Sequence, residues 1–119
     1  MNKISLQEKY ELIDEHWDPK IIGSVNDMDV KLAKIKGNFE YHTHQDNDEL
    51  FYVVEGELIM KYRNSQETVQ KGEMIIVPKG VEHKPYAEEE TQIMLFEAKG
   101  TLNTGDKRSE LTKENLEKI

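Results

Sequence analysis

The hydrophobic residues of this chain occur mostly in short runs that are separated by polar turn residues. Residues 30–36 (VKLAKIK) and 91–98 (TQIMLFEA) are typical runs, and both suit strands in a half-buried sheet. About eight such strands follow one another, with a turn signal every 8 to 12 residues. The pattern predicts an all-β fold, a sandwich or a barrel.

Several connections can be predicted from the turn residues. Residues 50–54 and 58–62 flank Gly56, and this arrangement predicts a β-hairpin. A turn at residues 63–65 and a polar edge strand at 66–71 should follow. Pro85 is expected to interrupt the strand pairing, and the run Glu88, Glu89, Glu90 is expected to lie in a solvated turn.

The two ends of the chain differ from this β pattern. Ser5 and Glu8 form a capping box, and apolar residues at near-helical spacing follow, so a short helix should end before Pro19. Leu111 and Ile119 lie in a charged segment with helical spacing, which predicts a short helical tail, frayed or docked. We expect one domain over residues 1–119, with its core at about 20–100.

Composition excludes several classes of function. The chain has no cysteine, so it has neither a disulfide framework nor a thiolate metal site. Its 24 acidic and 16 basic residues give a net charge of −8, which opposes binding to nucleic acid or to an anionic membrane. No long apolar run or signal-like N-terminal segment occurs, so a cytoplasmic location is the default expectation.

Three of the four histidines lie in two short motifs. His42 and His44 are two residues apart, so on a strand both imidazoles point to the same side. A turn-like Asp-Asn-Asp sequence separates them from Glu49, whose carboxylate can return to the same point. In the second motif a hydrophobic strand and a Pro-Lys-Gly turn precede His83. Imidazoles combined with a carboxylate suit a first-row transition metal.

Together these motifs resemble those of a small single-domain cupin, of the type often grouped with mannose-6-phosphate isomerase. The first motif is matched by His42, His44, Glu49 and Gly56, and the second by Gly72, Pro78, Gly80 and His83. Two positions depart from the pattern: Gly37 lies one residue closer to the first histidine than usual, and Ala87 replaces a frequent asparagine. The resemblance implies a double-stranded β-helix, or jelly roll, with a metal inside.

The proposed ligands are His42, His44, Glu49 and His83, and they would hold one divalent transition metal ion: manganese, iron, nickel, copper or zinc. Glu40 has the parity of His42, so it is expected to face the cavity as a base, and Tyr62 and Tyr86 are candidate proton donors. Three functions remain open. They are a metal-dependent enzyme acting on a small polar molecule (isomerase-like or dioxygenase-like), a non-catalytic metal or small-ligand binding module, and a structural cupin.

The remaining charged and apolar positions give further expectations. His16 lacks a partner histidine at ligand spacing and is expected on the surface, as are the charged ends of Lys31, Lys34 and Lys36. If Glu49 points inward, residues 50, 52 and 54 form an outward apolar stripe. Either a second copy in a two-fold homodimer or the N-terminal segment should cover this stripe.

Overall fold

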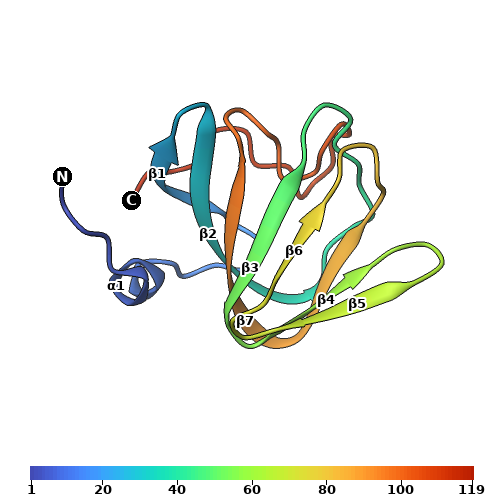
Figure 1. Ribbon diagram of the computed structural model, residues 1–119, viewed down its shortest axis with the longest axis horizontal. Helices are drawn as coiled ribbons and strands as arrows, with labels where there is room; N and C mark the ends of the chain where they lie inside the picture. Colours follow the sequence, from blue (N-terminus) through green and yellow to red (C-terminus); the bar gives the residue numbers. More distant parts are fainter.

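The computed structural model describes all residues from 1 to 119. It is an all-β barrel with one short helix (Figure 1), which confirms the predicted fold class. Its elements in chain order are α1 (Leu6–Glu11), β1 (Lys20–Val25), β2 (Met28–Asn38), β3 (Glu49–Glu55), β4 (Glu57–Lys61), β5 (Gln66–Gln70), β6 (Met74–Val77) and β7 (Lys84–Ala98).

Two long strands, β2 and β7, hold the barrel together. The main sheet has the order β1-β2-β7-β3-β6, and all of its pairs are antiparallel. The first part of β7 pairs instead with β4, which carries β5 as an edge strand, as the polar sequence of β5 predicts. Because β2 and β7 bend at the register shift between Ile35 and Gly37, one strand pair serves both layers of the jelly roll (Figure 1).

The core lies between the two layers and follows the alternation of inward and outward side chains. On β3, Glu49, Phe51 and Val53 are buried, whereas the residues between them are half-buried on the outer face. Leu58 and Met60 on β4 are fully buried and extend the same core. The parity predicted from an inward-facing Glu49 is therefore confirmed.

The predicted hairpin around Gly56 is wrong. Strands β3 and β4 do not pair with each other; both pair with β7, one in each layer. Gly56 has φ of +99°, and a Cβ added there would lie 2.5 Å from Thr91 Oγ1. The glycine therefore serves a tight corner packed against β7, at which the chain passes from one layer to the other.

The predicted interruption after His83 is also wrong, because β7 continues through Pro85. The acidic residues 88–90 are exposed, as expected, but they lie within β7. Their strand partner is the short stretch between Ile35 and Gly37, so they form a bulge that bends the strand. A run of charged residues occurs both in turns and at exposed bulges within strands. Composition alone does not distinguish the two, and this is why a turn was predicted.

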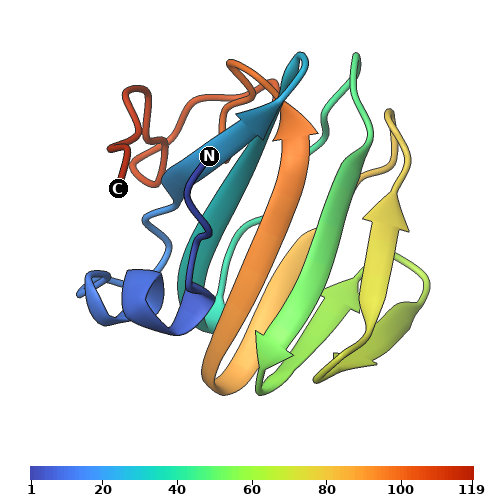
Figure 2. The same cartoon turned by 60° about the vertical axis from the view of Figure 1, so that its left-hand side comes forward.

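The N-terminal helix is confirmed. The Ser5 hydroxyl accepts a hydrogen bond from the Glu8 backbone N–H at 3.3 Å, as a capping box requires. Helix α1 lies beside the outer face of the sheet (Figure 2), where Tyr10 and Ile13 pack on Leu32. The N-terminal segment thus covers part of the outer apolar stripe. This six-residue helix is the only one, and it is too short and too polar to cross a membrane.

No helix forms in the C-terminal tail, so that expectation is wrong. Residues 101–119 fold as coil and turns along the barrel. The Ile21 N–H donates to the Glu117 carbonyl at 2.9 Å, and the Ile119 N–H donates to the Ile21 carbonyl at 3.0 Å. These strand-like bonds to β1 take backbone groups that a helix would need for itself.

Candidate metal centre

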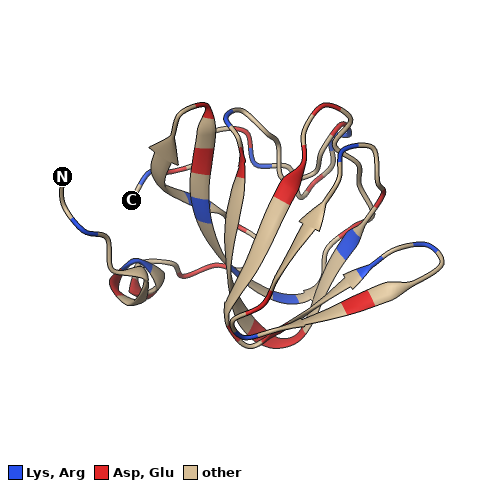
Figure 3. Ribbon diagram, in the orientation of Figure 1, with Lys and Arg blue, Asp and Glu red and all other residues tan.

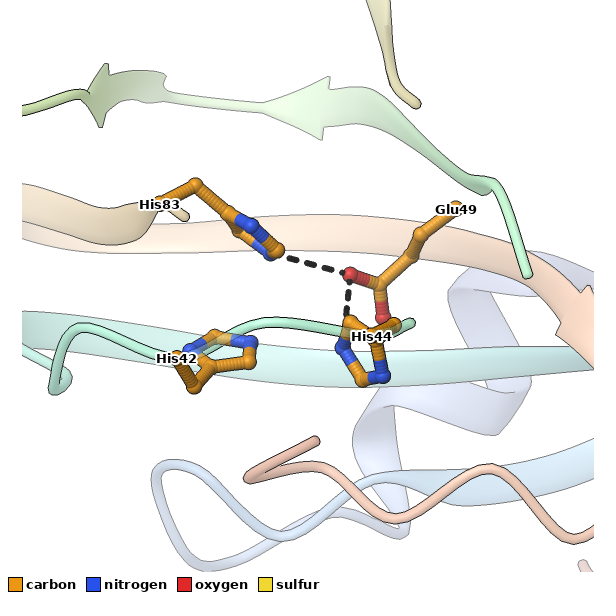
Figure 4. Close-up of side chains that lie close together, drawn as sticks. All are labelled: His42, His44, Glu49 and His83. Carbon is orange, nitrogen blue, oxygen red and sulfur yellow. Dashed lines mark hydrogen bonds and ion pairs between the residues drawn. The ribbon is translucent and has the colours of Figure 1, made fainter. Parts of the chain in front are cut away.

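The four predicted ligand residues lie together inside one end of the barrel. Their ligand atoms all lie within 4.8 Å of one another, and all four residues are buried. His42 and His83 face each other across a two-residue bridge with paired N–H to carbonyl bonds of 3.0 Å. Glu49 is the first residue of β3. Figure 4 shows the four side chains pointing toward a common centre, as the two motifs predict.

Two of the imidazoles are oriented by backbone carbonyls. His42 Nδ1 lies 2.9 Å from the Glu40 carbonyl, and His83 Nδ1 lies 2.9 Å from the Val81 carbonyl. A carbonyl oxygen only accepts hydrogen bonds, so each Nδ1 carries the proton in these contacts. The Nε2 atom of a neutral ring is then an unprotonated donor of electrons to a metal, as in most histidine metal sites.

Two imidazole nitrogens of the cluster converge on one carboxylate oxygen. His44 Nε2 and His83 Nε2 each lie 3.3 Å from the same carboxylate oxygen, Oε1 of Glu49. His44 Nε2 is buried without any hydrogen-bond partner. Neutral imidazole lone pairs directed at a carboxylate need a shared cation or an additional proton to be stable. The donor set of three nitrogens and one carboxylate fits a first-row transition metal.

Burial sets the protonation of the cluster. Burial, together with a smaller effect of the nearby His83, lowers the pKa of His42 to about 4. Burial alone would raise the pKa of Glu49, but contacts with Glu97, His44 and His83 outweigh it and hold that pKa well below its usual range. A neutral His42 and an ionised Glu49 are the forms that bind a metal ion.

A small chamber of about 40 Å³ opens beside the cluster. Its wall is largely apolar, and no lysine or arginine belongs to it. The lining residues are Trp17, Pro19, Ala33, Ile35, Phe39, His42, Glu49, Phe51, Pro85, Ile93, Leu95, Glu97 and Asn103. At about 10–15 Å³ for each water molecule, the enclosed part accommodates roughly three waters. The enclosed space therefore accommodates a small group, such as the metal-binding end of a larger molecule.

An aromatic series connects the N-terminal segment to the cluster. Trp17 stacks on Phe39 with ring centroids 4.9 Å apart, and Phe39 meets His42 edge-on at 5.4 Å. The indole N–H of Trp17 donates to the Lys36 carbonyl at 2.9 Å, which fixes the ring. The only tryptophan of the chain is therefore close to the proposed metal ligands.

Sequence reasoning missed two buried charged residues near the cluster, Lys31 and Glu97. The expectation that Lys31 extends into solvent is wrong, because its ammonium group is buried and lies 2.7 Å from Glu97 Oε1. Glu97 pairs across the sheet with Glu49. Alternation could have found both: Lys31 shares the inward parity of Ala33, and Glu97 that of Leu95. Lys34 instead donates to the Ile13 carbonyl at 2.8 Å, while Lys36 is exposed.

The predicted catalytic residues lie outside the chamber wall. The Glu40 carboxylate accepts a hydrogen bond from Ser109 and lies 3.8 Å from Lys107 Nζ, so the C-terminal segment holds it. Tyr62 packs against the main core, and Lys61 lies over the ring of Tyr86. Catalytic roles for Glu40, Tyr62 and Tyr86 stay predictions.

His16 lies outside the cluster, on the surface as expected, and its imidazole contacts Glu90 at 2.8 Å.

Comparison with known proteins gives a consistent result. Residues 29–98 match the Cupin domain family (Cupin_2). The uncharacterized protein YdbB of Bacillus subtilis (strain 168) is 41% identical over 64 residues, which span 53% of this chain and 57% of YdbB. A cupin-2 domain containing protein of Shewanella frigidimarina is 46% identical, with a TM-score of 0.80, over 81% of this chain and 94% of that one.

A more distant likeness concerns the fold alone. The hydroquinone 1,2-dioxygenase PnpCD, in complex with Cd²⁺ and 4-hydroxybenzonitrile, is 15% identical, with a TM-score of 0.67. The match covers 77% of this chain and 70% of that chain.

Proposed function

Because the chain belongs to the cupin domain family, we propose that it is a metal-dependent enzyme acting on a small molecule inside the barrel. The observation that carries the proposal is the arrangement around Glu49 Oε1, where two imidazole nitrogens lie 3.3 Å away and one has no hydrogen-bond partner. A divalent cation would satisfy all of these atoms at once. A cluster built only for stability would instead pair each nitrogen with a hydrogen-bonding group.

The proposed ligands are His42, His44, Glu49 and His83, with manganese, iron, nickel, copper or zinc as candidate metals. A bound ion of this kind would polarise a substrate oxygen or, if redox-active, support an oxidation. The chain's own residues orient the ligands: the Glu40 and Val81 carbonyls fix two imidazoles, and Phe39 and Phe51 pack edge-on against His42 and His83.

The residues that line the chamber indicate which kind of substrate would bind there. Its apolar wall suits a molecule with an apolar body, and two of the proposed metal ligands, His42 and Glu49, belong to its lining, so an oxygen-bearing end of the substrate would bind there. The sequence predicted a small polar molecule as the substrate, and the apolar wall adds that the part remote from the metal is apolar. Because no lysine or arginine lines the chamber, a phosphorylated sugar would lack a charged partner there.

These features favour dioxygenase-like chemistry over isomerase-like chemistry. The cupin fold is compatible with it, since PnpCD shares the fold. A non-catalytic binding module is the second candidate, and the position of Glu40 supports it. The residue predicted to be the base is held by Ser109 and Lys107, so it is not available to the chamber.

A Co²⁺ titration of metal-free protein tests the proposal. We expect one ion per chain, visible Co²⁺ absorption, and quenching of Trp17 fluorescence, because Trp17 stacks on the residue that contacts His42. Acetohydroxamate, a small chelator, should then change the Co²⁺ spectrum, whereas mannose 6-phosphate should not. A change in the Co²⁺ spectrum with mannose 6-phosphate but not with acetohydroxamate would favour an isomerase-like function. Absence of Co²⁺ binding would contradict the proposal.

Turnover is tested separately. For a redox-active metal, oxygen consumption should depend on a small hydroxylated aromatic or aliphatic substrate and should stop when a chelator removes the metal. Metal binding without any turnover across such a panel would favour the binding module.

A further inference from the structure

A buried ion pair lies directly behind the proposed metal centre. Lys31 on β2 and Glu97 on β7 are 2% and 3% exposed, and Lys31 Nζ lies 2.7 Å from Glu97 Oε1. The same ammonium group donates to the Thr101 carbonyl at 3.3 Å. Figure 3 shows a basic position within the length of β2, the strand between β1 and β7. None of the four predicted metal ligands belongs to this pair.

The pair reaches the metal centre through the sheet. Glu97 and Glu49 are direct cross-strand partners of β7 and β3, and side chains in such positions stand next to each other. Both carboxylates line the same chamber and contact each other. The second oxygen of Glu97, Oε2, is buried without a hydrogen-bond partner. The chain Lys31–Glu97–Glu49 therefore leads from β2 across β7 to a ligand.

Stability gives no reason for this arrangement. Burying two charges has a desolvation penalty that their attraction often does not offset, and apolar residues of similar size are frequently at least as stable. Of the neighbouring inward positions on the same strands, Ala33 and Leu95 are apolar, whereas the buried Asp29 accepts a hydrogen bond from Ser24. A buried Lys–Glu pair at this place is therefore better explained by an effect on the adjacent carboxylate.

We propose that Glu97, held in place by Lys31, is a positioning residue that fixes the Glu49 carboxylate in the orientation required for binding a metal. The inference rests on the proposed function, since it presumes that Glu49 is a ligand. Groups that orient metal ligands in this way commonly change metal affinity by about 10–100-fold when they are removed. Glu97 acts through Glu49 and need not touch the metal itself.

The direct test measures Co²⁺ affinity and Co²⁺ absorption in four variants that circular dichroism shows to be folded. The double variant Lys31→Met/Glu97→Leu removes both charges of the ion pair, so that neither is left buried without the other. It should bind Co²⁺ about 10–100-fold more weakly than the parent, with a changed absorption spectrum. Glu97→Gln keeps an acceptor for Lys31 and a donor for Glu49, and should stay within about threefold of the parent.

Two further variants complete the test. Lys31→Met alone should weaken Co²⁺ binding in the same direction, and it covers the case in which the double variant does not fold. Lys34→Met is the matched control, because Lys34 lies on the same strand but bonds the Ile13 carbonyl, and it should leave affinity and spectrum unchanged.

The outcomes separate this inference from the proposed function. If the parent binds Co²⁺ and the folded double variant or Lys31→Met binds it with equal affinity and the same spectrum, the positioning role is wrong and the metal site stands. If Glu97→Gln is as weak as the double variant, charge rather than orientation matters, and the positioning role is also wrong. If the parent binds no Co²⁺, the proposed function fails, and this inference fails with it.

Discussion

The two ends of the barrel interior are built on the same strands but differ in chemistry. At one end, β3 and β7 place Val53 and Ile93 in a core that also contains Leu58. At the other end, the same two strands place Glu49 and Glu97 beside three histidines. Both ends are buried and both follow the same alternation, so burial alone does not distinguish them.

The two ends of the barrel interior serve different purposes, since one stabilises the fold and the other forms the proposed metal site. The apolar end removes hydrocarbon from water and supplies stability. The polar end carries desolvated charges and an imidazole nitrogen without a partner, and this arrangement reduces stability until a cation binds. We expect changes at the apolar end to alter stability without altering metal affinity, and changes at the polar end to alter metal affinity and the pH dependence of stability.

The largest effect should come from the apolar end. Leu58 is fully buried, so Leu58→Ala should lower the free energy of unfolding by about 2–5 kcal/mol through lost contacts and a cavity. Urea denaturation measures this change, with Leu111→Ala at an exposed position as the control. Metal affinity measured under folding conditions should be unchanged. A tenfold loss of affinity in folded Leu58→Ala would show that the two ends are not independent.

The pH dependence of the metal-free protein probes the polar end. Burial lowers the pKa of His42 from 6.5 to about 4, so the unfolded chain binds a proton between these values that the folded chain does not. Stability should therefore fall as the pH drops from 7 toward 4, by about 2 kcal/mol at pH 5.

Denaturation of the parent and of His42→Gln at several pH values isolates this effect, since other groups titrate in both proteins. Glu97 is one of these groups: burial and Glu49 raise its pKa well above the usual range, which acts in the opposite direction. The parent should lose more stability than His42→Gln between pH 7 and pH 5. Parallel curves for the two proteins would contradict the burial of a neutral His42.

The ligand variants should change metal binding more than folding. His42→Ala, His44→Ala and His83→Ala should each weaken binding at least about tenfold, or about 1.4 kcal/mol. His16→Ala is the matched control, because His16 is exposed and pairs only with Glu90. Calorimetric titration with Zn²⁺ measures the metal affinity of the ligand variants and of the control. Equal affinity in His83→Ala and the parent would show that the second motif does not contribute to the site.

The smallest effect on the fold should come from the outer face of the sheet. Helix α1 covers Leu32 and Val54, but Met74 and Ile76 on β6 remain about half exposed, at 57% and 51%. A second copy of the chain would cover them, and we retain the homodimer as a proposal. Met74→Lys/Ile76→Lys should leave monomer stability within about 0.5 kcal/mol.

Sedimentation at micromolar concentration measures the assembly. The parent should sediment as a species of twice the 13.9 kDa chain mass, and the lysine variant should sediment as a single chain. A monomeric parent would show that α1 provides sufficient cover and that the dimer proposal is wrong.

The sequence predicted much of the polar end. The two-residue spacing of His42 and His44 predicted that both reach one site together with Glu49, and they do, although the two histidines lie in the connection between β2 and β3 rather than on a strand. His83 lies far along the chain and was placed by its resemblance to the second cupin motif. The inward face of β3 also followed from alternation, because a one-residue shift would expose its core residues.

The rest depended on pairing across the sheet, which local pattern does not contain. Gly56 suggested a hairpin, and only the position of Thr91 on β7 shows that the chain passes between layers there. Lys31 looked like a surface lysine because its partner Glu97 lies 66 positions away. The Leu111 segment had helical spacing, but the chain end bonds to β1 instead. In each case a long-range contact outweighed a local preference.

Metal content measured on protein purified without added metal tests the central claim most directly. Elemental analysis by mass spectrometry should find about one transition metal ion per chain in the parent, and much less in His83→Ala prepared in parallel. A parent that contains no metal and binds neither Co²⁺ nor Zn²⁺ on titration would contradict the account.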